Sequence, residues 1–148
     1  MARYVTSLRT ERSPSDAFNY MADLRNFAEW DPGVRKVTQI SGDGGGPSAT
    51  FDVTVASVGR DMKLRYVTKE YAPSSALLVV AETSKLISTD RITVRPDGDG
   101  SIVTYDADLQ FRGIFKVFDL GLKLAFNRIG DRAAAGLRKA LDGTKVDA

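Results

Sequence analysis

The chain has 148 residues, of which 43% are hydrophobic, and 21 lysines and arginines nearly balance 19 aspartates and glutamates. This length fits one domain that can hold both a core and a cavity. The near-neutral charge gives no sign of a nucleic-acid-binding surface. Because histidine and cysteine are absent, imidazole and thiolate metal sites, disulfides, Ser-His-Asp triads and cysteine nucleophiles are excluded. We therefore expect no metal and no cofactor, and any catalysis must use aspartate, glutamate, tyrosine, lysine or arginine.

The N-terminal segment predicts a strand followed by two short helices. It contains neither the apolar stretch of a secretion signal nor a membrane span, so we expect a cytoplasmic protein. Residues 4–10 alternate in character, as strand residues do. Ser13 then has the position of a helix N-cap, and Pro14 the first helical position. Apolar residues continue at helical spacing as far as Trp30, and a possible second cap at Asp23 favours two helices over one.

The middle of the chain predicts an antiparallel sheet. Pro32 and Gly33 end the helical pattern, because proline lacks an N–H and glycine tolerates positive φ. From there to Phe111, alternating apolar and polar residues are separated by short turns rich in glycine, proline and serine. With the first strand the predicted total is seven, and the later six span residues 34–40, 49–58, 62–72, 76–82, 87–95 and 101–111.

A long helix is predicted from about Gly113 to Leu141, near the end of a single domain that spans residues 1–148. Residues 144–148 are expected to form a frayed tail. The helix has an apolar stripe that would cover the sheet, formed by Ile114, Phe118, Leu122, Ala125, Ile129, Ala133, Gly136 and Ala140. A strand, two short helices, six strands and a long helix together predict an α+β domain.

Two glycine-rich segments imitate ligand-binding loops but fit turns better. Residues 97–102 resemble the middle of a calcium loop, yet Arg95 occupies the first ligand position and the flanking residues alternate like strands. The glycine run at residues 42–46 is followed by a predicted strand, so no helix N-terminus faces it, as a phosphate site requires. Both segments are therefore predicted to be hairpin turns.

Three polar residues are candidates for chemistry inside the domain. Asp90 has the strand parity of Ile92 and Val94, so it is expected to point inward, where a carboxylate needs hydrogen bonds or a raised pKa. Tyr66 and Tyr105 lie on the inward faces of their strands and could direct a phenol at a carbonyl or hydroxyl. The alternatives are that Asp90 is partly exposed at a strand end and that both tyrosines are core residues with local partners.

A ligand-binding set follows from the same parity. Phe27 and Trp30 close the second short helix, where large aromatic residues form either a core plug or a pocket wall. The sequence does not decide which face of the 76–82 strand points inward. The predicted lining includes the residues for which these two questions are undecided. It comprises Phe27, Trp30, Phe51, Val53, Val55, Leu64, Tyr66, Leu78, Val80, Ile92, Tyr105, Leu109, Phe118, Leu122 and Ala125.

Residues 13–18 and 24–34, with a Pro-led helix and a Phe-x-x-Trp-Asp-Pro segment, resemble the opening of the START/polyketide-cyclase (SRPBCC) superfamily. Further similarity lies at residues 66–73, 98–105 and 109–113. The resemblance implies a helix-grip fold, in which the antiparallel sheet wraps around the long C-terminal helix and encloses a cavity. It also implies apolar ligands such as lipids, sterols, polyketides or plant-hormone-like molecules. No catalytic residue carries over, because the polar pocket residues of cyclase and dehydratase members differ between subfamilies.

Two functions are consistent with these patterns. The first is a carrier or sensor that binds an apolar small molecule without catalysis. The second is a polyketide cyclase, aromatase or dehydratase, with Asp90 as acid or base and Tyr66 or Tyr105 polarising a carbonyl.

A third class of function, interaction with a partner, rests on the last helix. Val117, Leu120 and Leu124 lie beside its core stripe and would leave apolar surface exposed. They predict a homodimer or a transient membrane contact, which is compatible with either of the other functions.

Overall fold

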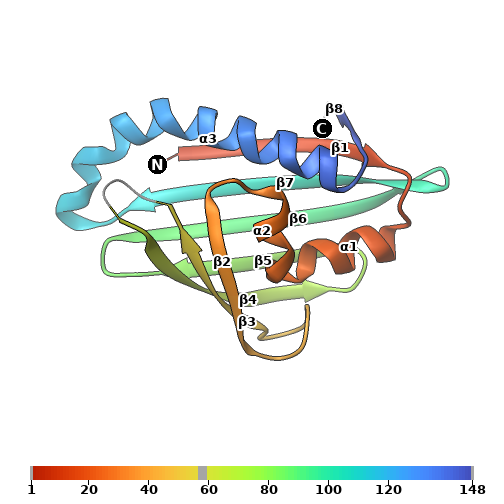
Figure 1. Cartoon of the computed structure of the whole chain (residues 1–148), viewed down its shortest axis with the longest axis horizontal. Coiled ribbons are helices and arrows are strands. Elements are labelled where there is room, and N and C mark those ends of the chain that lie inside the picture. The colour runs from red at the N-terminus through yellow and green to blue at the C-terminus, as the bar shows by residue number, and fades with distance from the viewer. Residues whose placement is uncertain (1, 57–59, 148) are drawn as a thin grey trace.

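The computed structural model describes residues 2–56 and 60–147, apart from the side chains of residues 119, 120, 122 and 124. An antiparallel sheet forms the body of the molecule, and α3 lies across one of its faces (Figure 1). In this part of the chain the sheet has eight strands, in the order β2-β3-β4-β5-β6-β7-β1-β8. The strands are β1 (Ala2–Thr10), β2 (Val34–Ser41), β3 (Thr50–Val55), β4 (Met62–Ala72), β5 (Ala76–Glu82), β6 (Leu86–Asp97), β7 (Gly100–Phe111) and β8 (Thr144–Val146).

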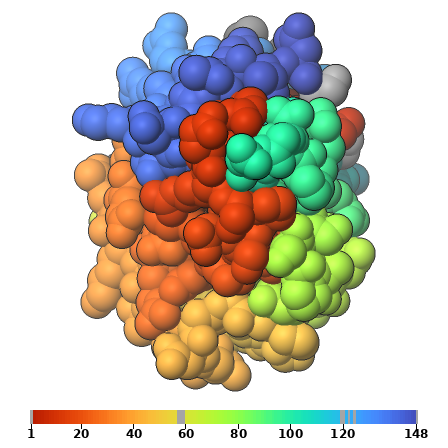
Figure 2. Space-filling view, turned by 90° about the vertical axis from the view of Figure 1, so that its right-hand side faces the viewer, coloured from red at the N-terminus to blue at the C-terminus, as the bar shows by residue number. Residues whose placement is uncertain are grey.

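The helices lie where the capping residues predict them. Ser13 caps α1 by accepting a hydrogen bond from the backbone N–H of Asp16 at 3.1 Å, and Asp23 accepts one from the N–H of Arg25. Two segments within the predicted helical stretches are 3₁₀ turns, η1 (Leu24–Asn26) and η2 (Gly113–Phe118). Figure 2 shows α1 at one end of the molecule, between the C-terminal helix and the loop after β2. The helices are α1 (Pro14–Ala22), η1 (Leu24–Asn26), α2 (Phe27–Trp30), η2 (Gly113–Phe118) and α3 (Asp119–Ala140).

The predicted count of seven strands is wrong, because part of the expected tail forms β8. The chain turns at Asp142, which has a φ of 50°, and at Gly143, whose N–H donates to the carbonyl of Arg138 at 2.7 Å. A Cβ at Gly143 would lie 2.8 Å from the carbonyl oxygen of Arg9. The residues from Thr144 then pair with β1, so they are held in the sheet.

The core lies between the inner face of the sheet and the two N-terminal helices. β4 alternates as predicted, with Leu64 buried and Lys63 exposed. On β5 the buried residues are Leu77, Val79 and Ala81; Ala81 pairs with the inward-facing Tyr66 of β4. The predicted lining residues of β5 have the opposite parity. Leu78 and Val80 therefore lie on the outer face of the sheet, and their prediction as lining residues is wrong.

Among the described residues of the long helix, the buried side chains lie in its C-terminal half. Ala133, Ala134 and Leu137 are buried. A Cβ at Gly136 would overlap the carbonyl of Trp30, so only glycine permits this close contact with α2. The first half of the predicted apolar stripe is wrong for the side chains that the structure describes, because η2 replaces its first turns and these stripe residues are exposed. The exposed stripe residues are Ile114, Phe118, Ala125 and Ile129, and the side chain of Leu122 lies outside the described residues.

Both rejected ligand loops are turns in the structure. Residues 97–100 connect β6 to β7, and Gly98 has a φ of 59°. The carboxylate of Asp97 accepts a hydrogen bond from Nε of Arg9 at 2.7 Å.

No described helix is long and apolar enough to cross a membrane.

Candidate functional site

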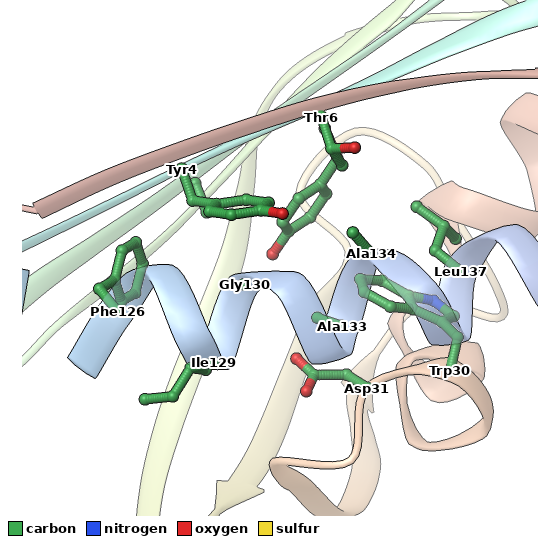
Figure 3. A pocket seen from close by; sticks show the side chains of 12 residues that line it. Tyr4, Thr6, Trp30, Asp31, Phe126, Ile129, Gly130, Ala133, Ala134 and Leu137 are labelled. Atoms are coloured by element: carbon green, nitrogen blue, oxygen red, sulfur yellow. The ribbon is translucent and has the colours of Figure 1, made fainter. Parts of the chain in front are cut away.

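A cavity of about 70 Å³ lies beside α3, between β1, β7 and the end of α2. Figure 3 shows Tyr4 and Thr6 on one side of α3, and Trp30 and Asp31 on the other. Pockets for drug-sized ligands usually measure about 300–1,000 Å³, so this volume suits a small chemical group or a few water molecules. Ile129 lines the cavity and is 48% exposed, which places the open end at the first half of α3.

An aromatic wall closes one side of the cavity. The rings of Trp30 and Tyr105 meet edge to face, with centroids 5.4 Å apart and an interplanar angle of 80°. One turn earlier in the chain, Phe27 packs behind them, 4.7 Å from Trp30. Phe27 is buried but does not line the cavity. Of the two predicted alternatives, Trp30 is therefore pocket wall and Phe27 is core.

A carboxylic acid lies directly behind this wall. Asp90 is buried on β6 with 5% exposure, so the predicted inward orientation is confirmed. The hydroxyl of Tyr105 donates to its Oδ2 at 2.8 Å. Burial raises the pKa of Asp90 to about 7, because the charged form loses its hydration. The hydrogen bond from Tyr105 opposes this rise, and the nearby charge of Asp31 adds to it.

Tyr66 lies deeper, in a second hydroxyl pair. Its hydroxyl and that of Ser88 are 2.6 Å apart in the core, and burial raises the pKa of Tyr66 above its usual value. Ser88 is two residues before Asp90 on β6, so the strand parity that identified Asp90 could also have found it. Tyr66 does not reach the cavity and matches the alternative of a core residue with a local partner.

Most of the lining residues were missed by sequence reasoning, and two of these have ionisable side chains, Asp31 and Tyr4. Asp31 in the turn after α2 accepts a hydrogen bond from the N–H of Gly33 at 2.8 Å, and burial raises its pKa. The sequence showed only the turn. The hydroxyl of Tyr4 donates to Asp131 on α3 at 2.7 Å. Burial, and to a smaller extent this hydrogen bond, raises the pKa of Tyr4 to about 12. Its inward parity on the first strand was a usable signal.

The family model described as "Polyketide cyclase / dehydrase and lipid transport" matches residues 1–142. The chain belongs to this family. No curated protein matches it significantly. The family covers both ligand carriers and enzymes by its description, so membership agrees with either predicted function and does not choose between them.

Solved structures show the same fold as this polyketide cyclase/lipid transport domain. A START superfamily protein from Mycobacterium smegmatis has a TM-score of 0.77 at 14% identity, over 96% of this chain and 98% of that one. The di-domain ARO/CYC protein StfQ of the steffimycin biosynthetic pathway has a TM-score of 0.67 at 11% identity, over 95% of this chain and 50% of that one. KanY has a TM-score of 0.70 at 18% identity, over 96% of this chain and 98% of that one.

The structure places the predicted lining residues in several different environments. Trp30 and Tyr105 line the described cavity. Asp90 contacts it only through Tyr105, and Val55 and Leu109 are partly buried against the core. Phe118 and Ala125 are exposed on the first half of α3 and its preceding turn. The remaining predicted residues of the sheet are buried in the core instead, and they are Phe51, Val53, Leu64, Tyr66 and Ile92.

Chemically, the described lining of the cavity offers hydroxyls, the carboxyl group of Asp31 and aromatic faces. Its described lining includes no lysine or arginine, and the described ion pairs of the chain involve neither Asp31 nor Asp90. Asp90 can exchange a proton with a bound molecule only by way of the Tyr105 hydroxyl. The described residues contain no acidic cluster suited to a metal ion.

Proposed function

We propose that the protein binds a small, largely apolar ligand in this cavity, with the Tyr105 hydroxyl as a polar anchor. The Tyr105–Asp90 hydrogen bond carries the proposal, because it orients a buried phenol at the edge of an aromatic wall. While donating to Asp90, the phenol oxygen can still accept a hydrogen bond from a ligand hydroxyl. The lipid transport in the family's description supports the same ligand class.

A lipid, sterol or polyketide-like ligand needs more room than about 70 Å³. The first half of α3 could supply it, because among its described side chains Ala125 and Ile129 are exposed. Displacing this half outward would lengthen the cavity past Phe126 and leave Leu137 packed. The ligand body would then lie along the helix, with its polar end at Tyr105.

Binding can be measured with the protein's own fluorescence, since Trp30 is the single tryptophan of the chain and lines the cavity. A hydrophobic fluorophore should saturate at about one site per chain and be displaced by fatty acids, sterols or polyaromatic compounds. Energy transfer from Trp30 to the fluorophore would place the probe near the cavity. Absence of saturable binding across this panel would refute the proposal.

A second candidate is catalysis as a polyketide cyclase or dehydratase. Its support is the raised pKa of Asp90, about 7, together with the hydrogen bond from Tyr105, since general acids and bases work best with a pKa near the working pH. In such a reaction Tyr105 would polarise a substrate carbonyl and Asp90 would exchange the proton through it. Tyr66 is too deep to touch a substrate in this geometry.

Asp90→Asn separates the two candidates, because it keeps the shape and removes the titration. For a binding protein, ligand affinity should stay within a few-fold of wild type. For an enzyme, turnover of a poly-β-ketone substrate should fall by roughly 10² to 10⁴, while binding persists. We expect the first outcome, and a large loss of turnover with unchanged affinity would favour the enzyme.

The partner surface can now be proposed more narrowly as a contact with an anionic membrane. Ile114 and Val117 on η2 are 80% and 77% exposed, beside the exposed cations Lys85 and Lys116. The nearby Arg112 is paired with Glu82 at 2.8 Å. Apolar side chains flanked by cations favour an anionic lipid surface. A ligand could then pass between the bilayer and the nearby open end of the cavity. Two predicted members of this surface have side chains outside the described residues, and they are Leu120 and Leu124.

A further inference from the structure

The cavity combines aromatic faces with an acid. Trp30 and Tyr105 form an edge-to-face corner, and Tyr4 and Phe126 contribute two further rings to the lining. In Figure 3 the carboxylate of Asp31 lies beside α3, on the side of Trp30 and opposite Tyr4. Aromatic faces attract cations through their quadrupole, most strongly where water is excluded.

The electrostatic balance of the cavity is negative and uncompensated among its described residues. The charge of Asp31 disfavours the ionised forms of Asp90, Tyr66 and Tyr105 alike, so these buried groups all experience its field. The described lining offers no lysine or arginine to offset it. Arg138 of α3 acts on Tyr4, whose hydroxyl is bound to Asp131. A positive charge inside the cavity would relieve this imbalance.

The carboxylate of Asp31 has an oxygen available for such a charge. Its Oδ1 accepts from the N–H of Gly33 at 2.8 Å, which fixes the side chain at the turn after α2. Its Oδ2 takes part in none of the described hydrogen bonds and ion pairs. Asp31 is therefore held in place by one oxygen while the other can face a ligand.

We infer that the cavity binds the ammonium end of an amine ligand, with Asp31 as counter-ion and Trp30 and Tyr105 as the aromatic walls. The inference rests on the proposed ligand-binding function and names the chemical class of its ligand. A volume of about 70 Å³ suits a small ammonium group. An apolar remainder of the molecule would extend toward Ile129, where the cavity is open.

The test compares a cation with its neutral isostere. Choline and dimethylbutanol have the same shape, but a quaternary nitrogen in the first replaces a carbon in the second. Titration of each probe against the fluorescence of Trp30 should show that wild-type protein binds choline at least about tenfold more tightly. Equal affinity, or tighter binding of dimethylbutanol, would overturn the inference.

The variant Asp31→Asn then tests whether the preference for choline over dimethylbutanol depends on this carboxylate. Asparagine keeps an oxygen that can accept from Gly33, so the turn should persist, while choline should lose its advantage over dimethylbutanol. The matched control is Asp99→Asn, which removes an equal charge from an exposed turn residue and should leave the preference intact. A preference that survives in Asp31→Asn contradicts the proposed counter-ion.

The outcomes also separate this inference from the proposed function. Saturable binding of the hydrophobic fluorophore without any preference for choline would overturn the amine ligand and leave apolar ligand binding standing. If the fluorophore, choline and dimethylbutanol all fail to bind in the cavity, both the proposed function and the inference fall together.

Discussion

The hydroxyl of Tyr105 connects the cavity to Asp90, which lies behind the aromatic wall and 2.8 Å from that hydroxyl. Tyr105 lines the cavity and Asp90 does not. A bound molecule can therefore be linked to Asp90 by hydrogen bonds through the hydroxyl of Tyr105. The stability of the fold, in contrast, depends on the ionisation of Asp90 directly, because its carboxyl group is buried.

Asp90→Asn should stabilise the protein, and more so at high pH. The pKa of Asp90 is about 7 in the folded state and about 3.9 in an unfolded chain. Between these values the unfolded state binds fewer protons, so wild-type stability falls as the pH rises from about 4 through about 7. Asparagine does not titrate. Its advantage in the free energy of unfolding should grow by about 3 kcal/mol from pH 5 to pH 8, measured by urea denaturation.

The control for this experiment is again Asp99→Asn, whose carboxyl group is exposed. Its effect on unfolding should be small and should barely change with pH. An Asp90→Asn protein that is destabilised equally at pH 5 and pH 8 would mean that the carboxylate is accommodated as an ion in the folded state.

Tyr105→Phe should weaken ligand binding, whereas Tyr66→Phe should leave it unchanged. Both variants lose a buried hydroxyl and leave a partner without its hydrogen bond, Asp90 in one case and Ser88 in the other. Each should cost about 1–3 kcal/mol of stability. Only Tyr105 lines the cavity, so only its substitution should weaken the affinity of a hydroxyl-bearing ligand, by several-fold. Isothermal titration calorimetry would show the difference; equal losses would place both residues at the ligand.

Gly136→Ala should destabilise the fold although alanine favours helices. The added Cβ would overlap the backbone carbonyl of Trp30, which cannot move without shifting α2. We expect a cost of about 1–3 kcal/mol. Gly121→Ala is the matched control on the same helix, since a Cβ there meets nothing within 4 Å. It should raise stability by up to about 1 kcal/mol. Thermal unfolding followed by circular dichroism would contradict the packing of α3 on α2 if both variants gained stability.

The double variant Ile114→Ser, Val117→Ser should weaken association with anionic vesicles. These side chains are exposed on η2, so the substitutions should leave the free energy of unfolding nearly unchanged. Co-sedimentation with vesicles containing phosphatidylserine should fall by about tenfold or more, because two apolar contacts with the bilayer are lost. The control Ile40→Ser changes another exposed residue, 48% exposed on β2. Equal sedimentation of both variants and wild type would exclude a membrane contact at η2.

The sequence predicted the inner face of β4 but not that of β5, for a physical reason. On β4 the charged residues Lys63 and Arg65 alternate with Leu64 and Tyr66, so one face is marked as exposed to water. The run at residues 77–80 is apolar on both faces of β5. Alternation then carries no information, and only the pairing of β5 with β4 settles the orientation.

The long helix and Asp31 show a different limit. Periodicity assumes that large apolar residues face the core, whereas α3 makes close contacts through glycines and alanines and leaves Ile129 exposed, and η2 before it leaves Ile114 exposed. Asp31 has the sequence signature of a turn residue. Its position at the cavity depends on how α2 packs against α3, and the local sequence around Asp31 does not predict that packing. Asp90 was predictable because strand parity alone determines its direction.

The short strand β8 has a consequence for how copies of this protein behave in solution. It covers Ser7, Leu8 and Arg9 of β1, which would otherwise lie at the border of the sheet. Uncovered backbone N–H and C=O groups on such a border can pair with a strand of another molecule. A chain cut after Gly143 would keep its cavity residues but lose this protection. It would therefore be more prone to aggregate through intermolecular strand pairing than the intact protein.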